Sequence, residues 1–252
     1  MSLASEARRR RFHQNGPWIL VGIAVVIAII AEAVHRHSIN SEEVWYFVVL
    51  IPSIILHEVS HGAVANACGD TTAKDAGRLT LNPFKHIDLF GTILLPILMI
   101  FTVHVAFGWA KPVPVSINRL RHPRNQAVLV GLAGPAVNIL LAAICALIFH
   151  ALTHGVPPPS NNGYVSGFSF GYELLYLGGL ANVIVAAFNL IPIPPLDGSA
   201  VVERLLPASM LPGYYRLRSF SMILVLVLVV AGQGPLNSLF DQVQNLWFNV
   251  AF

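Results

Sequence analysis

The sequence is short of charge. Only 11% of its 252 residues are Asp, Glu, Lys or Arg, whereas 55% are hydrophobic. Soluble domains carry about 25% charged residues, and a chain this poor in charge cannot cover the surface of a water-soluble globule of its size. The composition therefore excludes an ordinary soluble enzyme and predicts that lipid surrounds most of the chain. We expect no nucleic-acid partner.

Cysteine and long polar stretches are also scarce. The two cysteines, Cys68 and Cys145, form neither a disulfide framework nor a zinc-ribbon spacing. Both stand in apolar stretches, and we interpret them as small buried hydrophobes. There is no internal repeat, and no polar region is long enough for a separate soluble domain. These absences predict a single polytopic membrane domain over residues 1–252, with its core at 44–206.

Long hydrophobic runs, in contrast, are abundant. A membrane-spanning helix needs about 20 mostly apolar residues. Five segments meet this requirement: Pro17–Val34, Val44–Ala67, Asn125–Leu152, Tyr172–Ile193 and Tyr214–Ala231. The first run is not followed by a small-residue cleavage site, so we expect it to be retained. The prediction is an all-α integral membrane protein, multi-pass in the cell membrane, with about five to six transmembrane helices.

A sixth apolar run, Phe90–Phe107, is at the lower limit of length, and the basic residues predict its path. Cytoplasmic loops are enriched in Lys and Arg. If this run enters the membrane and returns without crossing, all but one of the 15 Lys and Arg residues lie on one face, and only Arg36 lies opposite. A full crossing gives a far more even distribution. We therefore expect a re-entrant segment and a cytoplasmic N-terminus.

The most informative motif is His-Glu-Val-Ser-His at residues 57–61. Positions i and i+4 project from the same face of a helix, so His57 and His61 can bind one zinc ion with Glu58 beside its open position. The pattern also occurs by chance on soluble helices, but ionisable groups at membrane depth are costly and usually functional. His57 lies roughly 20 Å from the start of its predicted helix at 1.5 Å per residue. The zinc site is therefore expected nearer the cytoplasmic face.

Asp197 is a candidate third ligand, since catalytic zinc sites usually have three protein ligands and a water. It follows the predicted helix Tyr172–Ile193 in a proline-rich stretch that cannot continue as a regular helix. In the re-entrant topology this helix and the histidine-bearing helix both run towards the cytoplasm, so Asp197 arrives on the same side of the membrane as the histidines. The residues alone leave an alternative open, in which Asp197 only caps a following helix over Gly198–Leu206.

Three motifs in this order resemble the site-2 protease family of intramembrane metalloproteases. His57–His61 matches its HExxH helix, Asn189–Gly198 resembles its NxxPxPxLDG motif, and Gly131–Asn138 resembles its GxxGPxxN stretch. The resemblance implies that Asp197 is the third ligand of one Zn²⁺ per chain. It also implies that Glu58 is the general base acting on a zinc-activated water.

The same resemblance implies a biological role, the hydrolysis of peptide bonds in or near the transmembrane segments of single-span membrane proteins. Such regulated intramembrane proteolysis takes place in the lipid bilayer. Many relatives carry a PDZ domain or a CBS pair, and neither fits in this chain, so we expect a minimal version. The substrate, the regulatory trigger and the oligomeric state stay open.

Two further features have open alternatives. Asn138 is a polar residue in an apolar helix, and it is a candidate contact to the oxyanion or the substrate; an interhelical hydrogen bond is at least as good an interpretation. Gly77–Pro83 alternates apolar and polar residues as a β-strand does. We expect a short β-like interfacial loop there, either as an edge that pairs with an extended substrate or as an ordinary loop strand.

Two other classes of function compete with the protease. A membrane transporter or metal-binding protein would use the same His and Asp groups but would not need Glu58, and the chain lacks the internal repeat common in transporters. An inactive relative would act as a membrane-protein binder. The complete set of His57, Glu58, His61 and Asp197 favours the enzyme.

Overall fold

The computed structural model describes most of the chain from residue 41 onwards. The described residues are 41–88, 91–92, 110–153, 160–161, 164–165, 170–207, 209–221, 223, 225, 227 and 233–251. The predicted span Pro17–Val34 lies outside them, as do nearly all of Phe90–Phe107 and much of Tyr214–Ala231. The chain divides into two compact units, Met1–Phe47 and Val48–Phe252, and every residue of the site described below belongs to the second.

Three of the described helices are long and apolar enough to cross a membrane, namely Val48–Ala67 within α2 (Ser41–Ala67), α5 (Pro123–Thr153) and α6 (Phe170–Asn189). They correspond to three of the five predicted spans, and the expectation of an all-α membrane protein is confirmed. The third helix ends at Asn189 rather than at Ile193. It ends early because the prolines that follow lack the N–H groups that would continue it.

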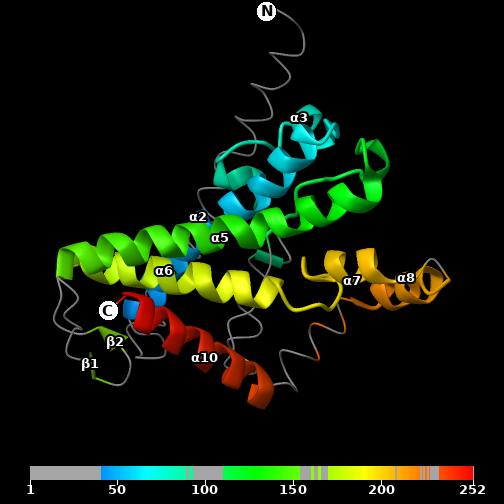
Figure 1. Cartoon of the computed structure of the whole chain (residues 1–252). Helices are drawn as coiled ribbons and strands as arrows, with labels where there is room; N and C mark the ends of the chain where they lie inside the picture. Colours follow the sequence, from blue (N-terminus) through cyan, green and yellow to red (C-terminus); the bar gives the residue numbers. More distant parts are fainter. Residues whose placement is uncertain are drawn as a thin grey trace, which may run out of the picture. The chain divides into compact units, whose positions relative to one another are not determined.

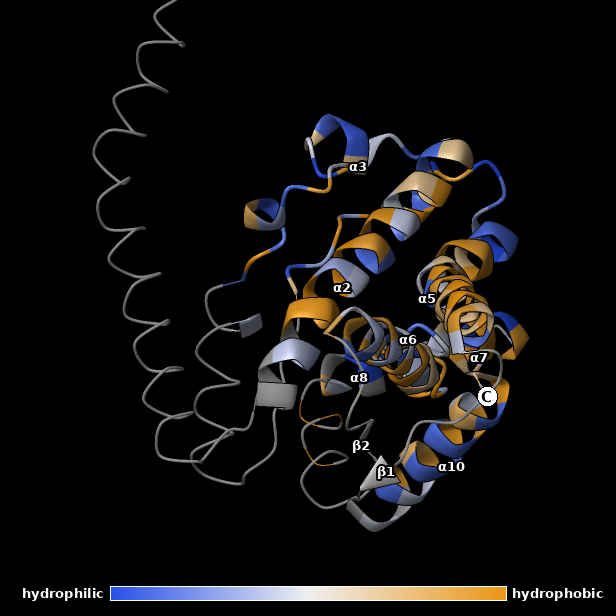
Figure 2. Ribbon diagram, turned by 90° about the vertical axis from the view of Figure 1, so that its left-hand side faces the viewer, coloured by the Kyte–Doolittle hydropathy of each residue, from blue (hydrophilic) through white to orange (hydrophobic). Residues whose placement is uncertain are grey.

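Helices α5 and α6 form an antiparallel pair that lies side by side along its length (Figure 1). Figure 2 views both nearly end-on and shows them as mostly hydrophobic ribbons. Phe149 of α5 is fully buried and packs edge-on against Tyr172 of α6. In the connection between the two helices, β1 (Ser160–Asn161) pairs antiparallel with β2 (Tyr164–Val165).

Helix α10 (Gln233–Ala251) packs against α6 and α5. Its buried Trp247 contacts the ring of Tyr176, and Phe240 contacts Phe188. We did not expect a helix here, because its polar and apolar residues are interleaved and no long hydrophobic run marks it. The remaining elements are short: α3 (Thr72–Asp75), η1 (Pro83–Lys85), η3 (Ile117–Arg119), α7 (Ser199–Leu205) and α8 (Leu211–Ser219).

The end of α2 and the start of α5 are fastened to one another. The amide of Arg121 donates to the carbonyl of Cys68 at 3.0 Å. The buried carboxylate of Asp70 accepts from the amide of Ser116 at 2.6 Å and from the amide and hydroxyl of Thr72. Burial alone would raise the pKa of Asp70, but these hydrogen bonds outweigh it and hold the pKa below its usual range. The described segments on either side of residues 93–109 therefore meet at the same end of the helices.

The expectation of a β-like loop at Gly77–Pro83 is wrong. The described residues form no strand there; the chain bends after α3 and enters η1, where Asn82 caps the turn by accepting from the amide of Phe84. The alternating pattern has another cause, because Arg78 is a buried polar residue that binds backbone carbonyls rather than facing water. The hypothesis that an extended substrate pairs with this stretch required a strand edge, and the structure has none at Gly77–Pro83.

Candidate metal centre

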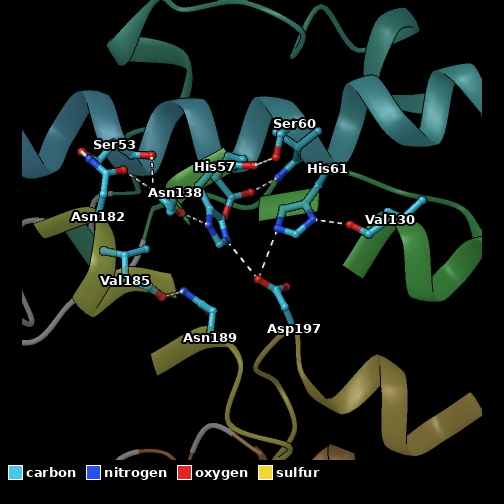
Figure 3. Close-up of polar contacts among 12 residues, drawn as sticks. Ser53, His57, Ser60, His61, Val130, Asn138, Asn182, Val185, Asn189 and Asp197 are labelled. Carbon is cyan, nitrogen blue, oxygen red and sulfur yellow. Dashed lines mark hydrogen bonds and ion pairs between the residues drawn. The ribbon is translucent and has the colours of Figure 1, made fainter. Parts of the chain in front are cut away.

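Two histidines of α2 face the interior between α2, α5 and the end of α6 (Figure 3). His57 and His61 are one helical turn apart, and only 4% and 9% of their surfaces are exposed. Their rings meet edge to face with centroids 4.7 Å apart. The spacing in the motif therefore places both imidazoles on one buried face, as the sequence predicts.

The orientation of both rings is fixed by acceptors on α5. Nδ1 of His57 donates to Oδ1 of Asn138 at 2.6 Å, and Nδ1 of His61 donates to the carbonyl of Val130 at 2.6 Å. A carbonyl can only accept, so we assign the protons of the neutral rings to Nδ1. Both Nε2 atoms are then left with free lone pairs. Metal-binding histidines are commonly oriented in this way.

Asp197 meets these two nitrogens. Its Oδ2 lies 3.0 Å from Nε2 of His57 and 3.3 Å from Nε2 of His61. The loop reaches back because the amide of Gly198 donates to the carbonyl of Asn189 at 2.7 Å. A side chain on Gly198 would collide with the carbonyl of Leu190. Gly198, not Asp197, is the N-cap residue of α7, and no side-chain bond caps it, so the alternative role of Asp197 is set aside.

The three groups fit a metal ion by their chemistry. One ligand atom from each of His57, His61 and Asp197 lies within 4.8 Å of the others. With both histidine protons on Nδ1, three lone-pair atoms converge with no hydrogen between them, and Oδ2 of Asp197 has no hydrogen-bond donor. A buried cluster of acceptors needs a compensating cation. Two imidazoles and one carboxylate are a ligand set typical of catalytic zinc.

Helix α5 carries a glycine, Gly134, at the point that faces the two histidine rings. A Cβ atom added to Gly134 would collide with Nε2 of His61 and with Cε1 and Nε2 of His57. The glycine thus leaves open the space in front of the two ligand nitrogens.

Glu58 is positioned by a different part of the chain. The amide of Val113 donates to its Oε2 at 2.9 Å. Val113 itself is buried, and its side chain lies against Gly62, one turn further along α2. The carboxylate between the two histidines in the sequence is therefore held by a backbone donor rather than by a basic side chain.

Comparisons with known proteins identify the family. A family model described as Peptidase family M50 matches residues 166–232. YwhC of Bacillus subtilis is 38% identical to this chain over 190 residues, which cover 74% of this chain and 80% of YwhC. The chain belongs to peptidase family M50.

With two other relatives, the matched region covers a smaller share of the relative's length. Rip2 of Mycolicibacterium smegmatis is 32% identical over 60% of this chain and 53% of Rip2. MJ0392 of Methanocaldococcus jannaschii is 23% identical over 73% of this chain and 40% of its own length. The words "zinc metalloprotease" stand in the names of all three relatives. No solved structure matches the chain.

Membership of M50 confirms the resemblance to the site-2 protease family. Together with the three apolar helices, it makes the chain a membrane-associated zinc metalloprotease. An M50 enzyme must hold its metal, and the His57, His61 and Asp197 cluster is the one group of this kind in the described part of the chain.

Asn138 of this M50 chain lies in a buried hydrogen-bond network that joins three helices (Figure 3). Its Nδ2 donates to Oδ1 of Asn182 at 2.6 Å and to the carbonyl of Ser53 at 3.4 Å. Asn182 in turn donates to the hydroxyl of Ser53 at 2.9 Å. Asn138 has no exposed surface, and its amide is fully used. Of the two roles left open by the sequence, this geometry favours the interhelical hydrogen bond over an oxyanion contact.

The sequence motifs do not predict three of these groups, namely Asn182, Ser53 and the carbonyl of Val130. Asn182 and Ser53 belong to none of the three motifs, and the carbonyl of Val130 leaves no trace in a side-chain pattern. Polar residues in apolar helices are the signal that could have found the first two.

The network yields a prediction for Asn138. Changing Asn138 to leucine removes the acceptor that orients His57, so zinc affinity should fall roughly 10- to 100-fold. Changing it to aspartate keeps an acceptor for Nδ1 of His57 and should retain most of the affinity. Competition with a zinc chelator measures both variants. Equal affinities for the leucine variant and the wild type would contradict the orienting role.

Proposed function

We propose that the chain is an intramembrane zinc endopeptidase that cleaves single-span membrane proteins in or near their transmembrane segments. The observation that carries the proposal is the convergence of His57, His61 and Asp197 beside Glu58 on α2, a helix fit to cross a membrane. Zinc would be bound by the two Nε2 atoms and the Asp197 carboxylate, one ion per chain. A protease with such a site hydrolyses bonds at membrane depth.

A zinc ion held by His57, His61 and Asp197 would supply Lewis acidity, which would bring the pKa of a water towards about 7 and polarise the scissile carbonyl. Glu58 takes the proton of the attacking water and later delivers it to the leaving amine. The Val113 amide holds one carboxylate oxygen, which leaves the other oxygen for the water. Asn138 and Val130 keep the histidine rings in place throughout.

The substrate must open its helix before it can be cut. In the bilayer, the carbonyls of a spanning helix are engaged in its own hydrogen bonds. We therefore propose that the preferred substrates are single-span segments weakened by Gly or Pro near the cleaved bond.

The topology belongs to the same proposal. The chain leaves α2 and enters α5 at the same end, which the Cys68–Arg121 and Asp70–Ser116 hydrogen bonds hold together. This supports a re-entrant path without net crossing for the segment between them. The excess of Lys and Arg on one face supports a cytoplasmic N-terminus and a site nearer the cytoplasmic face. Fusing an alkaline-phosphatase reporter at Lys111 should give no activity, because that enzyme matures only outside the cytoplasm.

The decisive variant for the proposed function is Glu58→Gln. Purified wild-type and variant proteins are incubated in detergent with fluorogenic single-span peptides that carry Gly or Pro in the apolar segment. Wild type should cleave at least one peptide, and Glu58→Gln should lower the rate by a factor on the order of 10² to 10⁴ while keeping its zinc. Cleavage that is unaffected by the substitution would contradict Glu58 as the general base and with it the proposed function, and no cleavage by the wild type would favour the transporter or the inactive relative.

A further inference from the structure

Arg78 is a buried cation without a carboxylate partner in the described part of the chain. Its exposed fraction is 8%, and it takes part in none of the ion pairs formed by the described residues. Instead, its guanidinium donates to the carbonyl of Lys111 at 2.7 Å and to the carbonyl of Pro112 at 3.3 Å. A buried charge is costly unless something compensates it, so its position needs an explanation.

The two carbonyls belong to the segment that holds Glu58. The carbonyl of Pro112 and the amide of Val113 are the two ends of one peptide group. Its oxygen accepts from Arg78, and its N–H donates to Oε2 of Glu58. Pro112 and Pro114 have no N–H, so Val113 carries the single backbone donor of this Pro-Val-Pro run.

This arrangement couples a cation to an anion through one peptide. A donor at the carbonyl oxygen draws electron density away from the amide and makes its N–H a stronger donor, as in other hydrogen-bonded chains. The positive guanidinium and the negative carboxylate also stabilise one another across the peptide, because a low-dielectric interior screens them weakly. Arg78 thus fixes both the position and the donor strength of the Val113 amide.

We propose that Arg78 is a positioning residue for Glu58, acting through the Pro112–Val113 peptide. Its hydrogen bonds go to Lys111 and Pro112 and to none of the metal ligands, and it keeps the Glu58 carboxylate at the orientation needed to take a proton. The proposal rests on the proposed function of Glu58 as the general base.

The first test separates positioning from binding by kinetics on the single-span peptide that the wild type cleaves. Arg78→Gln should lower kcat on the order of 10- to 100-fold, the range for a displaced catalytic group, with KM and zinc content unchanged. Arg78→Lys keeps the charge and a donating nitrogen, and it should recover part of the loss. The control is Arg124→Gln, because Arg124, although exposed, also donates to two backbone carbonyls, those of Arg204 and Leu206, far from Glu58 in the sequence.

The second test needs no substrate. The thermal unfolding temperature is measured for wild type, Arg78→Gln, Glu58→Gln and the double variant, and again with Arg124→Gln in place of Arg78→Gln. If Arg78 acts through the peptide on the carboxylate charge, Arg78→Gln should lower Tm clearly less in the Glu58→Gln background than in wild type. Arg124→Gln should lower Tm equally in both backgrounds.

The outcomes distinguish this inference from the proposed function. Equal Tm losses for Arg78→Gln in both backgrounds, or a kcat equal to that of Arg124→Gln, overturn the positioning role even if Glu58→Gln abolishes cleavage. Active Glu58→Gln protein overturns the proposed function, whereas the Tm coupling between Arg78 and Glu58 would still stand as a property of the fold.

Discussion

Replacing Gly134 by alanine should weaken zinc binding strongly while leaving the helices folded. The new methyl group would collide with Nε2 of His61 and with the His57 ring, and a zinc ion needs that space at about 2.0–2.1 Å from each nitrogen. We expect zinc affinity to fall on the order of 100-fold or more, the upper end of what supporting residues cost. Peptidase activity should disappear with the metal.

The control for this substitution is Gly178→Ala on α6. A Cβ there would meet only the sulfur of Cys145 at 3.8 Å, which is an ordinary contact. Both changes replace a helical glycine by a better helix former, so neither should lower the helix content measured by circular dichroism. If the Gly134→Ala protein kept one zinc per chain, the placement of the metal between α2 and α5 would be wrong.

Changing Asp197 to asparagine should lower zinc affinity by a similar factor, but it should not lower the Tm of the metal-free protein. Loss of the carboxylate removes the third ligand and its charge, so zinc affinity should fall on the order of 100-fold or more. Without metal, however, the wild type holds the Asp197 carboxylate 3.0 and 3.3 Å from the two Nε2 atoms, where only a further proton on a histidine can pair with it. Asparagine supplies an N–H donor to Nε2 of one histidine, so the Tm of the metal-free Asp197→Asn protein should equal or exceed that of the metal-free wild type.

The comparison uses Tm with and without a chelator, and Asp241→Asn serves as the matched control because Asp241 is an exposed acid on α10. Wild type and Asp241→Asn should lose stability when zinc is removed, and Asp197→Asn should not respond. A chelator response in Asp197→Asn as large as in wild type would exclude Asp197 from the ligand set.

The parts of this site that the sequence predicts are those that depend on local spacing. His57 and His61 are four residues apart on a helix, so a single periodicity places them on one face. Predicting Asp197 as the third ligand required both a membrane topology and a family resemblance. The structure places its carboxylate beside both histidines. The Asn189–Gly198 motif prepares this contact through the backbone bond between its two ends.

The parts that the sequence could not predict depend on contacts between distant segments. The collision that makes Gly134 necessary is with side chains of another helix. The bonds from Arg78 to Pro112 and from Val113 to Glu58 join residues far apart in the chain. The wrong strand at Gly77–Pro83 shows the same limit, since alternation reports polarity but not whether a polar side chain faces water or a buried carbonyl.

Zinc X-ray absorption on the purified wild-type protein tests the central claim most directly. Metal analysis of the same protein should give one zinc per chain. The absorption spectrum should show a first shell of nitrogen and oxygen at about 2.0–2.2 Å that includes two imidazoles. The Asp197→Asn and Gly134→Ala proteins should lose this signal. A shell with sulfur at about 2.3 Å, which would implicate Cys68 or Cys145, or a wild type without bound zinc, would contradict a metal centre made of His57, His61 and Asp197.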